Sequence, residues 1–318
     1  MLLSILSILT GLVILVWSAD RFVLGAAATA KNLGMSPMLI GLTIVAFGTS
    51  APEMLVSLTA ALEDAGNLAI GNAVGSNIAN IGLVLGITAL IAPLPVKSGV
   101  LKKEIPLLLG ITLIAGYVLH DFILDFKDGI LLFTSLALCL FIFAKYQHSG
   151  AADDHLADEA EEIPEMKTST AVFWLVIGLS LLIASSKMLV WGATQVAIML
   201  GVSDLIIGLT IVAIGTSLPE LAASITSALK NHHDIALGNV VGSNIFNLAA
   251  VMALPGFVDT LAVEEIAFNR DYLVMLCITL VLIVFCLLQK PARISRTEGG
   301  FLTLAYAGYM AMLYTTSI

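Results

Sequence analysis

The sequence predicts an all-α polytopic membrane protein: ten transmembrane helices that form two inverted-topology five-helix repeats, with broken helices 2 and 7. Three observations lead to this fold class. The chain has 318 residues, of which 59% are hydrophobic and only 12% are charged, whereas soluble domains average about 25% charged residues. Ten apolar runs alternate with polar breaks, and one long stretch of sequence occurs twice. A soluble fold is therefore excluded.

Each apolar run is long enough to cross a bilayer as a helix, which takes about 17–25 residues. The first run lacks the basic region of a cleavable signal and is interpreted as a retained transmembrane helix. Cys139, Cys277 and Cys286 all lie within apolar runs and are expected to be small core residues. The ten expected helices are 3–29, 36–62, 67–92, 104–120, 127–146, 169–198, 203–229, 234–258, 271–289 and 299–316.

Lysine and arginine residues orient these helices. When the N-terminus is placed outside, the inner loops carry ten basic residues and the outer loops carry two. This positive-inside bias predicts that both termini lie on the non-cytoplasmic side. The protein is expected to be integral to the bacterial inner membrane. The acidic segment within 147–168 is expected to be a solvated cytoplasmic linker. The inner basic residues are Lys31, Lys97, Lys102, Lys103, Lys145, Lys167, Lys230, Lys290, Arg293 and Arg296, and the outer ones are Lys127 and Arg270.

The duplicated stretch defines two repeats. Residues 41–81 align without a gap with 208–248, and 24 of the 41 positions are identical, which identifies a duplicated unit. Five helices separate equivalent points, and because five is odd, the second copy crosses the membrane in the opposite sense. Such inverted repeats place a binding site near the midplane, where the copies meet. The predicted organisation is a first repeat over 1–146, a linker over 147–168 and a second repeat over 169–318.

The first motif within each copy combines a helix breaker with an acid. Pro52 lacks an N–H and its ring clashes with the carbonyl of Gly48, so the helix must break across "FGTSAPE". The freed backbone oxygens are tolerated in a membrane only where they line a cavity. Thr49 and Ser50 stand just before Glu53, at the expected gap. The second copy repeats the arrangement with Thr216, Ser217, Pro219 and Glu220.

The second motif places amides and a hydroxyl on one helix face. Asn72, Ser76 and Asn80 follow one another at intervals of four residues, so their side chains share a face. Small residues in the same helices favour close packing of neighbouring backbones. The equivalent polar residues are Asn239, Ser243 and Asn247, and the small residues are Gly71, Gly75, Gly238 and Gly242.

All candidate ligands in these motifs are oxygens, because neither motif contains Cys or His. This inventory suits hard cations such as Ca²⁺ or Na⁺ and argues against zinc and copper. A carboxylate at the bilayer centre costs at least ~3 kcal/mol, and Glu53 and Glu220 would repel each other. A divalent cation between them removes both problems. The pair could hold one Ca²⁺ or several Na⁺, which gives antiport a simple basis in competition.

The same residues allow several alternatives. A glutamate could be a structural partner of a lysine or a protonated packing residue, and single Ser or Asn residues could serve as polar contacts between helices. A cation channel is less favoured, because the chain carries its own inverted symmetry. An intramembrane enzyme is disfavoured, since no nucleophile, metal triad or cofactor motif accompanies the glutamates. Asp20, Arg21 and Lys187, the equivalent of Asp20, are interpreted as charge-paired or snorkelling residues.

At these motifs the chain resembles the sodium/calcium exchanger family of the Ca²⁺:cation antiporter superfamily, and its ten helices resemble the prokaryotic members. The α-repeats of that family correspond to 41–81 and 208–248. The resemblance implies a secondary antiporter that moves Ca²⁺ against several Na⁺ by alternating access. It implies shared carboxylates at Glu53 and Glu220, and backbone carbonyls of Thr49 and Thr216 in the calcium site. The remaining implied positions are Ala46, Ala213, Ser50, Ser217, Ser76 and Ser243 for Na⁺, with Asn80 and Asn247 at the centre.

The chain departs from some relatives in this family. Asn80 and Asn247 are both amides where some members have an acid, which argues against potassium dependence. The proton-coupled branch has a Glu after "GN", whereas this chain reads "GNAVGSN" and "GNVVGSN", so Ca²⁺/H⁺ exchange is the alternative function. The long regulatory loop of animal exchangers is replaced by the short acidic linker. No enzyme activity, cofactor or nucleic acid partner is expected; the expected partners are Ca²⁺, Na⁺ and the lipid bilayer.

Overall fold

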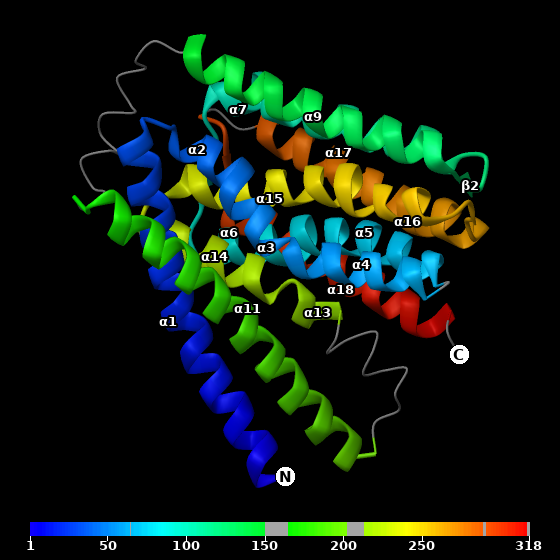
Figure 1. The fold of residues 1–318 in the computed structure, drawn as a ribbon, viewed down its shortest axis with the longest axis horizontal. Helices are drawn as coiled ribbons and strands as arrows, with labels where there is room; N and C mark the ends of the chain where they lie inside the picture. Colours follow the sequence, from blue (N-terminus) through cyan, green and yellow to red (C-terminus); the bar gives the residue numbers. More distant parts are fainter. Residues whose placement is uncertain (64, 150–164, 202–212, 289–290, 317–318) are drawn as a thin grey trace.

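The computed structural model describes residues 1–63, 65–149, 165–201, 213–288 and 291–316. Helices dominate the described residues, together with four strands of two residues each (Figure 1). The elements of the first half are α1 Leu2–Leu33, α2 Pro37–Ile40, η1 Gly41–Val45, α3 Ala46–Thr49, α4 Ala51–Leu62, α5 Gly66–Ala79, η2 Asn80–Leu85, α6 Gly86–Ile91, β1 Leu94–Pro95, α7 Ser98–Lys102, α8 Glu104–Leu119, β2 Ile123–Leu124 and α9 Phe126–Ser149.

Within the described residues, the second half broadly follows the same order of elements. Its first elements are α11 Thr168–Met199, α13 Ala213–Thr216, α14 Leu218–Leu229, α15 His233–Phe246, η4 Asn247–Val251 and α16 Ala253–Val258. The last are β3 Leu261–Ala262, η5 Ala267–Tyr272, α17 Leu273–Leu288, β4 Arg293–Ile294 and α18 Arg296–Thr316. The predicted linker 147–168 and the first half of the predicted helix 203–229 lie largely outside the described residues.

The described helices include six that are long and apolar enough to cross a membrane, and seven if one bent pair counts as a single span. The bent pair consists of Pro37–Thr49 and Ala51–Leu62, which meet at 44°. The other predicted spans fall short for different reasons: α8 has only 16 residues, 203–229 is only partly described, and α18 is long enough at 21 residues but not apolar enough. The count of ten therefore stays a prediction. The six helices are Leu2–Leu33, Gly66–Ile91, Phe126–Lys145, Thr168–Met199, His233–Val258 and Ala267–Leu288.

The longest helices, α1 and α11, pack against each other and slant away from the other helices (Figure 1). Each has 32 residues. Glycines allow their backbones to meet: a Cβ on Gly178 would lie 2.6 Å from the Phe22 nitrogen. The Ser7 hydroxyl also donates to the Met188 carbonyl at 2.8 Å. The two helices thus form one closely fitted unit.

The remaining helices are joined by contacts that come in pairs. In each pair, the second contact joins the corresponding positions with the copies swapped. β1 pairs with β4, and β2 pairs with β3, both antiparallel. At one end of the bundle the Lys97 ammonium, which follows β1, pairs with Asp234 at the start of α15 at 2.8 Å. At the other end, Asn67 near the start of α5 donates to the carbonyl of Ala262 in β3 at 3.2 Å. The helices α5–α6 and α15–α16 therefore run antiparallel.

The predicted close approach at the glycines is confirmed for one copy. A Cβ added to Gly238 would lie 2.8 Å from the Met38 carbonyl oxygen, and one added to Gly242 would lie 2.5 Å from the Leu42 carbonyl oxygen. The helix α15 therefore lies directly against α2 and η1 of the first copy. At Gly71 and Gly75, an added Cβ meets no atom of the described residues within 4 Å.

The close contact between α1 and α11 predicts that adding one methyl group at this contact lowers the stability of the protein. Gly178→Ala should destabilise the protein by about 1–3 kcal/mol, because the new Cβ would overlap the Phe22 backbone. Gly110→Ala in α8 is the matched control, since nothing described lies within 4 Å of its Cβ position. Thermal unfolding in detergent, followed by circular dichroism, should show a lower midpoint for Gly178→Ala only. Equal midpoints would contradict the tight contact.

Candidate functional site

Two helix breaks position the glutamates. The helix ends at Thr49 and restarts at Ala51, with Ser50 at φ −84° and ψ 2° between them. In the second copy, Ser217 separates α13 from α14 with φ −89° and ψ 3°. A proline lies in the first turn of each restarted helix, where a missing N–H causes no loss. The predicted breaks are therefore present at equivalent positions.

Each break is followed by a buried acid. Glu53 and Glu220 lie in the first turns of α4 and α14, and each is only 1% exposed. The N-terminus of a helix carries partial positive charge and favours a carboxylate there. The Ser50 hydroxyl donates to Glu220 Oε1 at 3.5 Å, so the first copy contacts the acid of the second. The Oε2 atoms of both glutamates have no hydrogen-bond partner among the described residues.

Thr49 makes a second link between the copies. Its hydroxyl donates to Asn239 Oδ1 at 3.1 Å and lies 3.5 Å from the Ser243 hydroxyl. It also lies 3.4 Å from the Ala46 carbonyl oxygen, in its own helix. All four residues are buried. Polar atoms from η1–α3 and from α15 thus meet beside the first break.

Asparagines brace both acidic helices in the same way. Asn72 donates to the Glu53 carbonyl at 3.1 Å and to the Ser57 hydroxyl at 3.0 Å. The equivalent bonds in the second copy run from Asn239 to the Glu220 carbonyl at 3.3 Å and to Ser224 at 2.9 Å. These bonds fix the backbone of each glutamate. Ser57 and Ser224 were not identified as site residues from the sequence. Their shared position, four residues after the glutamate of each copy, is the signal that could have found them.

The central amides begin two π-helical segments. η2 starts at Asn80 and η4 starts at Asn247, so the irregularity is repeated at equivalent positions. Both asparagines are 1% exposed, and Asn80 Nδ2 and Oδ1 and Asn247 Oδ1 lack hydrogen-bond partners within the described chain. π-Helical turns inside α-helices occur frequently at functional sites. Nearby, Asn77 donates to the Asn244 carbonyl at 3.1 Å, joining the two copies directly.

The other predicted site residues are placed as follows. Ser76 and Ser243 are buried on α5 and α15. Ser217 is 1% exposed, and its hydroxyl has no partner among the described residues. Thr216 is half-buried at the end of α13. Ala213 begins α13, and the structure gives no description of its side chain.

This arrangement calls for a positive charge. Buried polar atoms without partners are costly, and an unpaired buried carboxylate is the most costly of all. Here two carboxylates are buried, and the Ser50 hydroxyl donates to one of them. No group of three or more His, Cys, Asp or Glu residues that could hold a metal occurs in the described part of the chain. The site can therefore be neutralised by a cation bound to few acids and several neutral oxygens, or by protons.

Two equivalent Pro-broken helices, each with a buried acid, within a bundle of apolar helices are typical of a membrane transporter, and comparison with known proteins specifies the family. The sequence model of the family "Sodium/calcium exchanger protein" matches residues 3–145 and 170–315. The chain therefore belongs to the sodium/calcium exchanger protein family. The resemblance noted from the motifs is confirmed.

Full-length relatives agree with this assignment. The chain is 48% identical over 319 residues to "Putative antiporter CaxA" of Alkalimonas amylolytica, covering 99% of this chain and 100% of the relative. It is 40% identical to "Inner membrane protein YrbG" of Escherichia coli K12, over 100% of this chain and 98% of that protein. It is 32% identical to "Sodium/calcium exchanger MaX1" of Methanosarcina acetivorans, with 98% of each chain covered.

A solved structure shares the fold. The sodium-calcium exchanger NCX_Mj, in a crystal soaked without Na⁺ and Ca²⁺, superposes with a TM-score of 0.84 and 34% identity. The match covers 97% of this chain and 98% of that chain. Together with its apolar helices, these relatives show that the chain is an integral membrane protein of a transporter family, not one of enzymes.

The asparagine brace can be tested apart from transport. Asn239→Ala should destabilise the protein by about 1–3 kcal/mol, because it removes the amide that accepts from Thr49 and donates to Ser224 and to the Glu220 carbonyl. Asn269→Ala is the matched control, since Asn269 is exposed in η5. Thermal midpoints in detergent measure the difference. If the two variants unfold at the same temperature, the bonds of Asn239 do not support the site.

Proposed function

We propose that the chain is a secondary active antiporter that exchanges Ca²⁺ for Na⁺ at a midplane site shared by Glu53 and Glu220. The observation that carries the proposal is that both acids are buried beside equivalent helix breaks, and that Ser50, from the copy that holds Glu53, donates to Glu220. A divalent cation neutralises both acids. Several Na⁺ do the same in overlapping positions, so the two ions compete and do not bind together.

The proposed ligands follow the duplicated motifs. Glu53 and Glu220, with the carbonyls of Thr49 and Thr216, would hold Ca²⁺, since such hard oxygen ligands suit this ion. The unpartnered Oε2 atoms of both glutamates support this assignment, and the unpartnered oxygens of Ser217 and the central amides support the Na⁺ positions given next. The oxygens proposed for Na⁺ are those of Ala46, Ala213, Ser50, Ser217, Ser76 and Ser243, with Asn80 and Asn247 at the centre.

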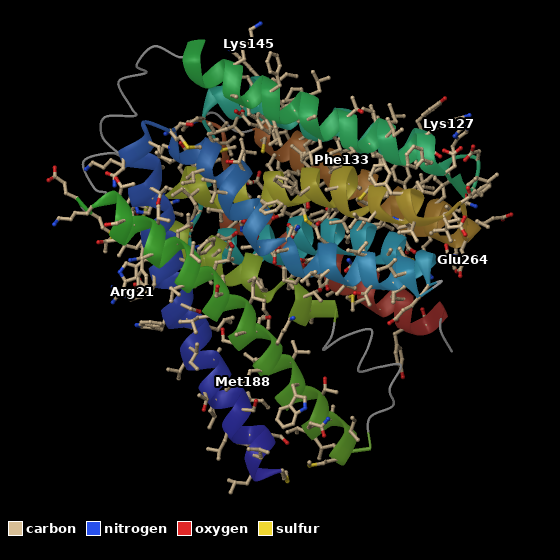
Figure 2. The ribbon with its side chains drawn as sticks, in the orientation of Figure 1. Arg21, Lys127, Phe133, Lys145, Met188 and Glu264 are labelled. Atoms are coloured by element: carbon tan, nitrogen blue, oxygen red, sulfur yellow. The ribbon has the colours of Figure 1, made fainter. Side chains whose placement is uncertain are left out.

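The proposal includes the membrane topology. Ten spans would form inverted repeats over 1–146 and 169–318, joined by a cytoplasmic linker over 147–168, with both termini outside the bacterial inner membrane. The antiparallel course of α5–α6 and α15–α16 supports the inversion. The two separate matches to the family model support the division of the chain. Lys127 and Glu264 lie near the end of the bundle that this topology places outside, and Lys145 lies at the opposite end of α9 (Figure 2).

Ion flux tests the exchange. In proteoliposomes, an outward Na⁺ gradient should drive ⁴⁵Ca²⁺ uptake. Glu53→Gln or Glu220→Gln should lower the rate by more than about tenfold, because loss of one partner of a buried charge cluster costs about 3–5 kcal/mol. Glu264→Gln, at an exposed loop position, is the matched control and should transport normally. Uptake that ignores the Na⁺ gradient and follows an imposed proton gradient would replace this proposal with Ca²⁺/H⁺ exchange.

Binding can be measured without transport. Ca²⁺ at about 100 times its Kd should stabilise the purified protein by about 2.7 kcal/mol, since it binds only the folded chain. The thermal midpoint in detergent should rise with Ca²⁺, and the rise should vanish in Glu53→Gln and Glu220→Gln but persist in Glu264→Gln. A Ca²⁺-dependent rise of equal size in the glutamate variants would place the cation elsewhere.

A further inference from the structure

An ion pair joins the α1–α11 unit to one end of the helix bundle. Lys230 Nζ, just after α14, lies 2.7 Å from Asp20 Oδ1 in the middle of α1. The neighbouring start of α15 holds Asp234, which pairs with Lys97. Asp20 and Lys230 therefore tie α1 to the end of the bundle that carries β1 and β4. The predicted topology places this end at the cytoplasm.

The repeat supplies a second set of charges with opposite signs. At the offset of 167 residues, Asp20 corresponds to Lys187 and Lys230 corresponds to Glu63. The charges are therefore reversed between the copies. Asp20 on α1 is acidic and its equivalent on α11, Lys187, is basic. A pair of complementary charges is thus kept at both equivalent positions, although the residue types differ.

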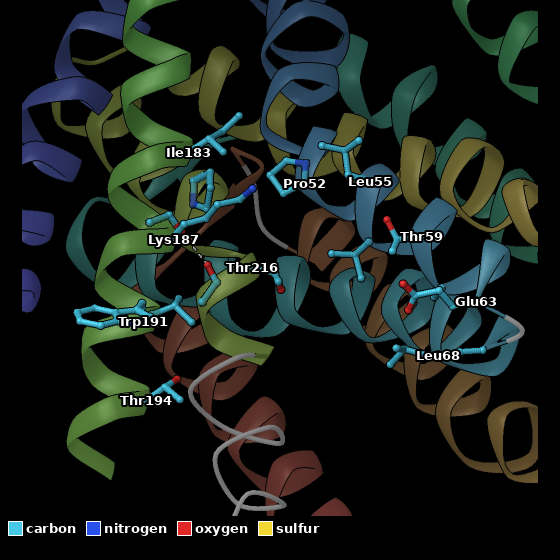
Figure 3. A pocket seen from close by; sticks show the side chains of 17 residues that line it. Pro52, Leu55, Thr59, Glu63, Leu68, Ile183, Lys187, Trp191, Thr194 and Thr216 are labelled. Carbon is cyan, nitrogen blue, oxygen red and sulfur yellow. Dashed lines mark hydrogen bonds between the residues drawn. The ribbon is translucent and has the colours of Figure 1, made fainter. Parts of the chain in front are cut away.

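The residues of the second set, Glu63 and Lys187, are not in contact with each other (Figure 3). Lys187 and Glu63 are both exposed, and no ion pair joins them among the described contacts. They line a pocket of about 680 Å³ between α11 and α4, on opposite sides of Pro52 (Figure 3). The pocket is also lined by Thr216 and Pro219 at the second helix break. It therefore leads from the far end of the bundle to the residues beside both glutamates.

We propose that Asp20–Lys230 and Glu63–Lys187 are alternating electrostatic latches that close opposite ends of the ion pathway in turn. The described conformation has the first latch closed and the second open. Because α1 and α11 pack as one unit, one movement of this unit can bring Lys187 to Glu63 and carry Asp20 away from Lys230. The assignment rests on the proposed antiport and adds the residues that hold its two states.

The exposure of the closed pair fits such a role. The side chains of Lys230 and Asp20 remain 32% and 40% exposed. Ion pairs exposed to this degree contribute little net stability. Exchanging one for the other therefore changes the energy of the two states only slightly, which an antiporter needs in order to populate both.

Cross-linking tests the two positions directly. In a chain with Cys139, Cys277 and Cys286 replaced by alanine, two double variants are made, Asp20→Cys with Lys230→Cys and Glu63→Cys with Lys187→Cys. A short bifunctional methanethiosulfonate should link the two pairs under opposite conditions, comparing Na⁺, Ca²⁺ and neither ion. Each link should stop ⁴⁵Ca²⁺ uptake, and a reductant should restore it. If the Glu63–Lys187 pair never links, or both pairs link equally under every condition, the proposal is wrong.

Charge exchange provides the second test. Lys187→Glu and Glu63→Lys should each slow Na⁺-driven uptake about two- to fivefold, the size expected for a partly exposed pair, and the combined variant should recover most of the rate. Lys127→Glu, at an exposed position away from the pocket, is the control and should transport normally. A combined variant no faster than the slower single variant would overturn the latch.

The two proposals fail differently. If the unmodified chain shows no Na⁺-driven ⁴⁵Ca²⁺ uptake, the proposed function is wrong, whatever the cross-links show. If uptake is normal while the cross-links do not alternate with the ions, exchange stands and the latch is wrong.

Discussion

The structure depends on one electrostatic constraint: two carboxylates are buried in a bundle built almost entirely of apolar helices. Glu53 and Glu220 are each 1% exposed, and unpaired charge in such surroundings is strongly unfavourable. The surrounding features reduce this cost. Helix N-termini begin beside both acids, Ser50 donates to Glu220, and asparagines hold both glutamate backbones in place. The charge that remains is what a transported cation would neutralise.

Duplication explains how a single chain builds such a site. Each copy supplies one broken helix and one helix with asparagine and serine on one face, and the polar contacts cross between copies, as from Thr49 to Asn239. The two short strand pairs, and the contacts at the two ends of the bundle, also connect one copy to the other at equivalent positions. The candidate site therefore takes its residues from both copies.

The two copies are alike in sequence but not in detailed contacts. The Ser50 hydroxyl donates to Glu220, whereas the Ser217 hydroxyl has no partner within the described residues. Asp20 is paired with Lys230, whereas Lys187 and Glu63 lie apart around a pocket. Under the proposed inverted-repeat exchange, a conformation that opens toward one side has to be asymmetric. The small-residue contact of α1 with α11 holds these two helices closely together.

The sequence alone determined the membrane class, the two helix breaks and the acids beside them. Composition and the effect of proline on its own helix are local properties of the chain. The ungapped repeat can be recognised by comparing one stretch of sequence with another. The tertiary structure decided which oxygens meet, that Ser57 and Ser224 brace the site, and that the central asparagines begin π-helical turns. It also added the four short strands to the predicted helices. These features depend on packing between segments far apart in the chain, such as Thr49 and Asn239, which no local pattern specifies.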